Sequence, residues 1–355
     1  MATVTPQTVL PVNAQQWAVS NSAAAPNPPY SGTFIPTLWS GKLAKKFYAS
    51  TIFGEIANTD WQGEISNLGD KVIINTIPTL STRPYKVGMQ LEYEVPSPET
   101  ITLQIDKARY FGVNVNDIME FQSKPNLMNM FTDDASTQMK LFIDQQVIFQ
   151  SFFKDDGTFK TSASGKDAVW DKNCGATAGA VTGAYNLGTD AAPVTLTPAN
   201  ILSYITMLST VLDEANIPEE GRYLVITPYE RQILMQSPLA QAQFMGDPRS
   251  VLRNGKLGSI DRFSIYLSNQ LPRAAAGKGF TNPEDAALTG DVAGAPKRHL
   301  IWAGTKAGIS FASQITKMEH LQNPNDFGQL VRGLQVWGSQ VTQGQCLAPM
   351  VIASA

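Results

Sequence analysis

The feature that most constrains the fold is an alternating run, ETITLQIDKARYFGVNVND, at residues 99–117. One set of alternate positions is apolar apart from two cations in its middle: Ile101, Leu103, Ile105, Lys107, Arg109, Phe111, Val113 and Val115. Such alternation predicts a single β-strand of roughly 50 Å, whereas most strands have only about five or six residues. A compact domain of this chain length has a radius of gyration of only about 20 Å. Part of the strand is therefore expected to leave the body of the protein.

The residues before this run predict a partner strand and a long two-stranded excursion. A turn and a strand are predicted by NLGDKVIINTIP at 67–78, and LEYEVPSPET at 91–100 alternates apolar residues with glutamates. Between them, TLSTRPYKVGMQ at 79–90 is rich in turn-forming residues and has no core pattern. We expect residues 61–109 to form an extended loop. An isolated ribbon of two strands is only marginally stable in water, so this loop needs a surface to lie on.

The tip of the expected loop is basic, although the whole chain is slightly acidic, with a net charge of −3. Between Lys71 and Leu91 the only charged residues are cations, namely Lys71, Arg83 and Lys86. The return strand then adds the acids Glu92, Glu94 and Glu99. A basic tip that lies on a neighbouring molecule is expected to meet carboxylates there.

The first 36 residues predict an extended arm rather than a helix. They contain Pro6, Pro11, Pro26, Pro28, Pro29 and Pro36, and proline interrupts helices. A disordered leader fits this stretch equally well. The opening MATVTPQTVLPV lacks the charged and long apolar segments of a secretory signal, and no apolar run in the chain reaches the length of a membrane span. A short helix is expected next, within residues 37–60.

Two long helices are predicted by apolar residues at helical spacing. For the helix over 132–154, Thr132 or Asp133 is the expected cap, and Asp133 and Asp134 would favour its positive N-terminal end. The second covers much of LTPANILSYITMLSTVLDEANI at 196–217, with Thr197 as cap and Pro198 in its first position. In TPYE at 227–230, the first and last residues have the spacing of a capping box.

Strands and helices alternate through residues 198–312, which predicts a compact α/β region. The expected strands are GRYLVI at 221–226, FSIYLSNQLP at 263–272 and RHLIWAG at 298–304. The C-terminal stretch LVRGLQVWGSQVTQGQCLAPMVIAS at 330–354 predicts two strands joined by a turn.

Sequence motifs for catalysis or cofactor binding are absent. The only two histidines, His299 and His320, have no nucleophile motif beside them, and Cys174 and Cys346 lie too far apart in sequence to form a local metal or redox motif. There is no GxxxxGK[ST] phosphate loop, no GxGxxG motif and no polybasic run. We therefore predict a protein that is not an enzyme, without catalytic, cofactor-binding or metal-binding residues, and without sequence-specific binding to nucleic acid.

The order of these parts resembles that of the major capsid proteins of tailed bacteriophages, which have the Hong Kong phage-type capsid fold. The likeness covers about residues 34–355, and three stretches carry it: NLGDKVIINTIP with the ribbon that follows, IPEEGRYLVITPYERQILM, and GSIDRFSIYLSNQLP with the closing GLQVWGSQVTQGQCLAP. The resemblance implies an α+β fold. Its parts would be an N-terminal arm (1–36), the first part of a peripheral domain (37–60), a long two-stranded extended loop (61–109), the peripheral domain with a long spine helix (110–197), an α/β axial domain (198–312) and peripheral C-terminal strands (313–355).

The resemblance also implies a function. Such a chain self-assembles into hexamers and pentamers of an icosahedral head that encloses a double-stranded DNA genome, which it contacts non-specifically. The expected partners are further copies of the chain, a portal protein, decoration proteins and a separate scaffolding protein, because 36 residues are too few for a cleaved scaffolding segment. The expected location is the virion capsid, assembled in the host bacterial cytoplasm without a membrane. The alternatives are the shell of a bacterial nanocompartment and, from another class, a soluble α/β hydrolase or binding protein.

In this family the extended loop lies across a neighbouring subunit. That arrangement would place Ile101, Leu103 and Ile105 on the neighbour and Phe111, Val113 and Val115 in the subunit's own core, with Lys107 and Arg109 where the strand leaves the body. A single bent strand in a β-sandwich is the alternative.

The candidate inter-subunit contacts are charged residues: Arg83, Lys86, Glu92, Glu94, Lys107, Arg109, Asp133 and Asp134. Asp133 and Asp134 are the carboxylates expected to meet the basic loop tip. Some relatives cross-link a lysine to an asparagine; Lys86 and Asn114 are present, but nothing singles them out for that chemistry.

Overall fold

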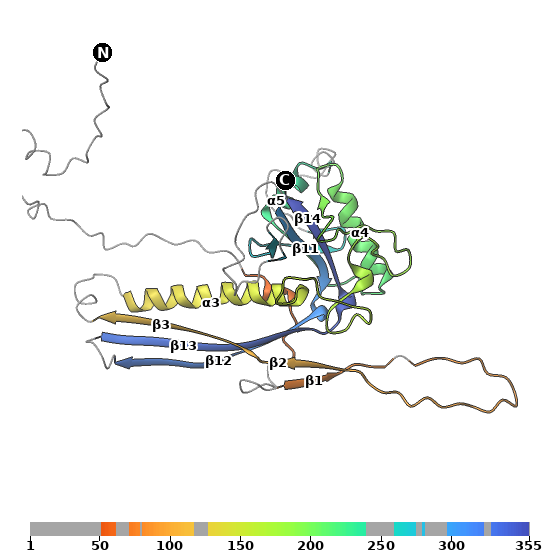
Figure 1. Ribbon diagram of the computed structural model, residues 1–355, viewed down its shortest axis with the longest axis horizontal. Coiled ribbons are helices and arrows are strands. Elements are labelled where there is room, and N and C mark those ends of the chain that lie inside the picture. Colours follow the sequence, from red (N-terminus) through yellow and green to blue (C-terminus); the bar gives the residue numbers. More distant parts are fainter. Residues whose placement is uncertain are drawn as a thin grey trace, which may run out of the picture. The chain divides into compact units, whose positions relative to one another are not determined.

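Two β-sheets and a long helix organise the chain (Figure 1). The computed structural model describes residues 51–61, 71–78, 80–116, 127–238, 259–274, 279–280, 297–322 and 328–354. All of these residues belong to one unit, which comprises residues 47–122 and 126–355. The expected arm at 1–36 lies outside the described residues, and so does most of the expected short helix. Within its range, the described part contains the single turn α1 (Phe53–Ile56).

The larger sheet has the strand order β6–β14–β11–β7–β9–β8, with β10 paired to β11. These strands are β6 (Val194–Thr195), β7 (Arg222–Ile226), β8 (Ser259–Ile260), β9 (Phe263–Leu267), β10 (Arg273–Ala274), β11 (Lys297–Thr305) and β14 (Leu347–Ser354). β11 is antiparallel to both β14 and β7, while β7 and β9 are parallel. Every residue of β7 is buried, as in a strand covered on both faces. The three strands predicted for the α/β region are confirmed.

Helix α4 (Ile201–Glu214) packs its apolar side into a hydrophobic core that it shares with the larger sheet. The start of the helix differs from the prediction. Asn200 occupies the N-cap position without a side-chain cap, and the helix begins at Ile201. The Asn200 side-chain oxygen instead accepts the N–H of Thr197 at 2.7 Å. This bond forms a separate turn before the helix, so the prediction of Thr197 as cap and Pro198 as first residue was wrong.

Helix α5 (Pro228–Met235) begins with the predicted capping box. Thr227 donates its N–H to Oε2 of Glu230 at 2.9 Å, and its hydroxyl accepts the N–H of Tyr229. The other Glu230 oxygen lies 2.6 Å from Nε2 of His299 on β11, and both side chains are buried. Burial acts to raise the pKa of Glu230, but hydrogen bonds from His299 and Thr227 outweigh it and lower that pKa below its usual value. The cap therefore also ties the helix to the central sheet.

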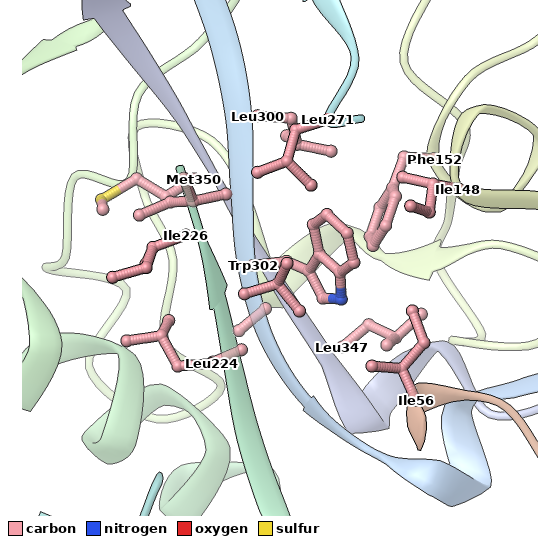
Figure 2. Packing of buried hydrophobic residues seen from close by; sticks show 14 of the residues in the cluster. Ile56, Ile148, Phe152, Leu224, Ile226, Leu271, Leu300, Trp302, Leu347 and Met350 are labelled. Carbon is pink, nitrogen blue, oxygen red and sulfur yellow. The ribbon is translucent and has the colours of Figure 1, made fainter. Parts of the chain in front are cut away.

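The core is centred on Trp302 of β11, which is fully buried (Figure 2). Its ring lies 5.0 Å from that of Phe152 between centroids, and Phe152 comes from the last turn of the long helix α3 (Leu127–Phe152). Leu347 of β14 and Ile56 of α1 belong to the same cluster. One hydrophobic core thus joins the larger sheet to the C-terminal half of α3 and to α1.

The second sheet has three antiparallel strands in the order β12–β13–β3, and α3 runs alongside it (Figure 1). They are β12 (Ile309–Gln322), β13 (Gly328–Val341) and β3 (Lys107–Asn116). A bulge lies in β12 between Ile315 and Lys317. Two small strands, β4 (Thr161–Ser162) and β5 (Val169–Trp170), form a parallel pair beyond the end of α3.

The alternating run at 99–117 forms two strands, so the prediction of one continuous strand was wrong. β2 (Thr100–Gln104) pairs with β1 (Lys71–Asn75), whereas β3 pairs with β13. The chain changes sheets where it crosses β13 at Gly338. A Cβ atom on Gly338 would lie 2.1 Å from the Gln104 carbonyl oxygen, so the two backbones touch there. The change of sheet lies immediately before Lys107, but the chain does not leave the body there, because Ile101, Leu103 and Ile105 are still buried.

The spine helix α3 is confirmed, but it begins at Leu127, several residues earlier than predicted. Thr132, Asp133 and Asp134 therefore lie inside the helix. The prediction of Thr132 or Asp133 as the cap was wrong, and the two aspartates do not lie at the N-terminal end. The carbonyl of Asp133 accepts hydrogen bonds from the Ser136 and Thr137 hydroxyls at 2.9 Å. Good helix formers such as leucine and methionine precede Thr132, which favours the longer helix.

The two predicted C-terminal strands are present as β13 and β14, with a short 3₁₀ turn at Gly344–Cys346 between them. They lie in different sheets, because β14 pairs with β11 and β13 pairs with β12 and β3. Assignment of all of residues 313–355 to the peripheral strands therefore does not fit β14. It belongs to the sheet of the α/β region.

Candidate assembly surface

The loop between β1 and β2 is a long excursion of the chain (Figure 1), and its apolar side chains are exposed. Every residue from 80 to 99 is exposed. The exposed large apolar side chains are Ile77, Leu80, Tyr85, Val87, Met89, Leu91, Tyr93 and Val95. The last four follow the turn at Val87 and Gly88 and share one parity, so they would line one face of an extended strand. Soluble monomers rarely leave a large contiguous apolar patch uncovered, so these residues indicate an interaction site.

Regular strand pairing is confined to the base of the loop. β1 and β2 pair from Lys71 with Gln104 to Asn75 with Thr100, and Thr76 donates its N–H to the Glu99 carbonyl at 2.9 Å. The two sides are then joined through side chains. Ser81 donates its hydroxyl and its N–H to Glu94, at 2.6 and 3.2 Å. These hydrogen bonds lower the pKa of Glu94.

The structure brings three of the candidate charged residues together within the loop. Arg83 pairs with Glu92, and its second terminal nitrogen lies 3.7 Å from Glu94. All three side chains remain substantially exposed. In the part of the chain that the structure describes, Lys86 forms no ion pair. The basic character predicted for the tip is thus reduced at Arg83 and retained at Lys86.

The apolar residues of β2 do not face outward, contrary to their predicted position on a neighbour. Ile101, Leu103 and Ile105 are each at most 1% exposed. Leu103 and Ile105 pack with Ala312 and Val336 of the subunit's own smaller sheet. The prediction that these residues rest on a neighbour was wrong, because β2 is the anchored base of the loop.

The residues after the crossing mostly lie as predicted. Phe111 and Val113 are half-buried and pack with Val331 of β13. The side chain of Val115 lies outside the described part. Arg109 places its guanidinium carbon 3.3 Å from the centroid of the Phe142 ring on α3, a cation–π contact.

A groove of about 460 Å³ lies between β3 and α3. β3 contributes Arg109, Tyr110 and Phe111, and α3 contributes Gln138, Met139 and Phe142. Asp133 and Asp134 lie on α3 just N-terminal to these residues. A second cavity of about 420 Å³, at the crossing, is lined by Lys107, Asp155 and Lys160 among others. Burial lowers the pKa of Lys160, and the nearby Asp167 and Asp155 oppose this change.

Asp144, in the middle of α3, is among the buried charged groups that sequence reasoning missed. Its side chain is fully buried, and one oxygen accepts the N–H groups of Ile52 and Phe53 at 3.2 and 2.9 Å. The other oxygen has no hydrogen-bond partner. Burial raises the pKa of Asp144 to about 6, against the two backbone hydrogen bonds. Its neighbours along α3 gave no sign that a carboxylate there would cap α1.

The histidines and cysteines form no metal centre in the described ranges. His299 is paired with Glu230 inside the core, and His320 is exposed on β12. Burial raises the pKa of the Cys174 thiol to about 12, which opposes thiolate chemistry. The described residues contain no group of three or more metal-ligating side chains, and none of their helices meets the length and hydropathy needed to span a membrane.

Comparison with protein-family models finds no match, and neither does comparison with curated proteins. Solved structures do match over most of the chain. A structure of Mycobacterium phage Che8 aligns with a TM-score of 0.64 and 21% identity, over 89% of this chain and 96% of that chain. The capsid structure of cyanophage P-SCSP1u gives a TM-score of 0.60 and 17% identity, over 90% and 92% of the two chains.

A third similar structure is the asymmetric unit of the mature capsid of bacteriophage PhiM1. Its TM-score is 0.58 at 15% identity, over 90% of this chain and 91% of that chain. Identities this low establish the fold alone. The α+β capsid fold expected from the sequence is confirmed.

Proposed function

We propose that this chain is the major capsid protein of a tailed bacteriophage. It would self-assemble into hexamers and pentamers of an icosahedral head that encloses double-stranded DNA. Its role would be structural, with no catalytic step of its own. The fold shared with phage capsid structures supports this proposal.

The observation that carries the proposal is the exposed extended loop. Val87 is 96% exposed and Val95 is 94% exposed, and both lie on a stretch with no strand partner beyond its base. A monomer with such a loop would leave apolar side chains and unpaired backbone groups in water, which favours association. A shell supplies a neighbour for the loop of every subunit.

The proposed partners are other copies of the chain, a separate scaffolding protein, a portal protein and decoration proteins. Packaged DNA would be contacted non-specifically, because the sequence has no polybasic run to support sequence recognition. The proposed location is the virion capsid, after assembly in the host bacterial cytoplasm.

Expression followed by electron microscopy and sedimentation analysis tests the proposal. We expect capsomers or closed shells, formed by the chain alone or with the scaffolding protein from the same genome. A matched variant with a short glycine linker in place of residues 78–97 keeps β1 and β2 and should remain a monomer. If the intact chain stays monomeric at 38.5 kDa with scaffolding protein present, the proposal is wrong. Nuclease-protected DNA in native particles would separate a phage head from a nanocompartment shell.

A further inference from the structure

The cavity of about 420 Å³ at the crossing has a mainly polar lining that is rich in lysine. Its walls come from β2, the start of β3, the end of α3, the turn that follows α3, and β13. Three of the lining residues are the lysines Lys107, Lys154 and Lys160, and two are the aspartates Asp106 and Asp155. The lining therefore carries more positive than negative charge.

The lysines of this cavity have no partner of opposite charge. Among the described residues, none of the three forms an ion pair. Lys107 and Lys160 are half-buried, so each ammonium group has lost part of its hydration. Burial accordingly lowers the pKa of Lys160. A cation that is partly desolvated and unpaired is stabilised by an anion placed beside it.

The nearby aspartates do not supply that anion. Asp155 and Asp167 raise the pKa of Lys160 through their charge, but neither lies within ion-pair distance of it. Both are exposed, and so is Asp106. Their carboxylates thus remain hydrated at the surface, and the half-buried ammonium groups are left for an anion from outside the chain.

The donor set indicates which class of anion fits. The cavity is lined by lysines and by no arginine, and Thr102 and Gln104 of β2 add a hydroxyl and an amide. Arginine offers the planar fork that matches a carboxylate, whereas lysine binds phosphate as a point charge. Donors that come from several walls suit a tetrahedral anion, whose oxygens point in several directions.

We propose that the cavity at the crossing binds a small oxoanion of the phosphate class, held by Lys107 and Lys160, with the exposed Lys154 at its rim. The bound anion would join β2 and β3 to the turn after α3. This site does not depend on the proposed function, because every group that forms it belongs to a single subunit.

Titration calorimetry of the purified full-length chain with inorganic phosphate tests the site, with ionic strength held constant by chloride. We expect saturable binding of one phosphate per chain. Lys160→Met should weaken it by about 10- to 100-fold, the range for loss of one charge-assisted hydrogen bond. This variant should fold, because methionine keeps the apolar stem and removes a desolvated charge. Lys140→Met, at an exposed position of α3, changes the net charge equally and should bind as wild type does.

Two further measurements separate a bound anion from a structural role of the lysines. Phosphate should slow acylation of Lys107 and Lys160 by an amine-reactive ester, read by mass spectrometry, and leave the rate at Lys140 unchanged. Asp155→Asn should tighten phosphate binding, because it removes a negative charge from the lining.

The site is overturned if wild type binds no phosphate, if Lys140→Met weakens binding as much as Lys160→Met, or if acetate protects the two lysines as well as phosphate does. A chain that assembles into shells but binds no phosphate would remove this site and leave the proposed function intact. A chain that binds phosphate but never assembles would keep the site and remove the function.

Discussion

Two extended segments of this chain have opposite surroundings. β11 is paired on both sides, by β7 and by β14, and its residues from Leu300 to Ala303 are buried. The loop stretch from Val87 to Val95 has apolar residues at every second position, yet all of it is exposed. Both segments are rich in apolar residues. The difference teaches that an apolar strand pattern predicts that its side chains become buried. It does not specify whether they are buried by the same chain or by another copy.

This contrast separates residues that stabilise the folded subunit from residues that support its assembly. Side chains around Trp302 are already buried in the isolated subunit, so their removal should weaken its folding. Side chains of the loop are not buried, so their removal should leave folding unchanged and weaken association. The four predictions below test this division, from the largest expected effect on stability to the smallest.

The largest effect is expected for Trp302→Ala. Loss of a large, fully buried aromatic side chain should lower the free energy of unfolding by about 3–5 kcal/mol. Denaturant unfolding followed by circular dichroism measures this change. The matched loop variant is Tyr93→Ala, which should stay within about 0.5 kcal/mol of wild type while its shell yield falls. Equal destabilisation by the two variants would contradict the division.

Gly338→Ala tests the crossing that separates the two regions. The added methyl group would overlap the Gln104 carbonyl oxygen, so the β2 backbone must shift, at a cost of about 1–3 kcal/mol. Hydrogen exchange should show faster exchange in β2, while β7 stays protected. Gly112→Ala on β3 is the control, because its new Cβ meets nothing within 4 Å. Unchanged exchange in β2 would show that the crossing does not hold the loop.

Asp144→Asn tests how much the buried charge of Asp144 lowers the stability of the folded subunit. The folded-state pKa is raised to about 6, so protonated Asp144 stabilises the fold fully below its unfolded pKa of about 4. This contribution is lost as the pH rises through 6. An asparagine still accepts the two N–H bonds without a charge, so we expect the variant to be more stable than wild type at pH 8 by about 1–2 kcal/mol.

The pH series supplies the control for this prediction. Below about pH 4 the wild-type carboxyl is protonated and no longer a buried charge, so the difference in unfolding free energy between wild type and the asparagine variant should shrink to nearly nothing. A variant that is less stable than wild type at pH 8 would show that the charged hydrogen bonds to Ile52 and Phe53 outweigh the cost of burial.

The smallest effect on stability is expected for Arg83→Glu with Lys86→Glu in the exposed loop. The far-ultraviolet circular dichroism and the unfolding free energy should match wild type within about 0.5 kcal/mol, since exposed ion pairs contribute little. Assembly should be impaired, most strongly at low salt, where screening is weakest. Normal shell yield at low salt would show that the loop tip is only a solvated turn.

Two further variants make the loop prediction specific. Lys172→Glu with Lys306→Glu changes the net charge equally at exposed positions elsewhere, and should assemble normally. Acid-to-base changes at Asp133 and Asp134 should restore assembly of the loop variant if these carboxylates meet the tip. Failure of this rescue would remove Asp133 and Asp134 as the partners.

Local sequence patterns predicted the parts of the fold that local interactions determine. The buried strand β7 follows from a continuous apolar run, and the start of α5 follows from the spacing of Thr227 and Glu230. The order of helices and strands was sufficient to indicate the capsid fold. The charged tip of the loop was also visible, although its internal pairing with Glu92 was not.

Long-range contacts explain most of what was missed. Alternation continues through residues 99–117 apart from Lys107 and Arg109 among the apolar positions. The change of sheet itself also depends on Gly338, far away in the sequence. The burial of Ile101 and Leu103 within the subunit depends on Val72, Ile74 and the smaller sheet, which no local pattern reveals. Asp144 resembles any acidic helix residue until α1 packs against it. Helix α3 began early because helix-forming residues precede the acids that resembled a cap.

The crossing at Gly338 also sets the mechanical leverage of the loop. From Asn75 to Val87 the extended chain is roughly 40 Å long, so a rotation of about 10° at the base would move the tip by about 7 Å. The spacing between neighbouring strands is only about 4.8 Å. A small rotation of β2, such as one caused by a methyl group added at Gly338, would thus move the loop tip by more than the spacing between neighbouring strands. Steric fit at one glycine therefore determines how accurately one subunit can aim its loop at another.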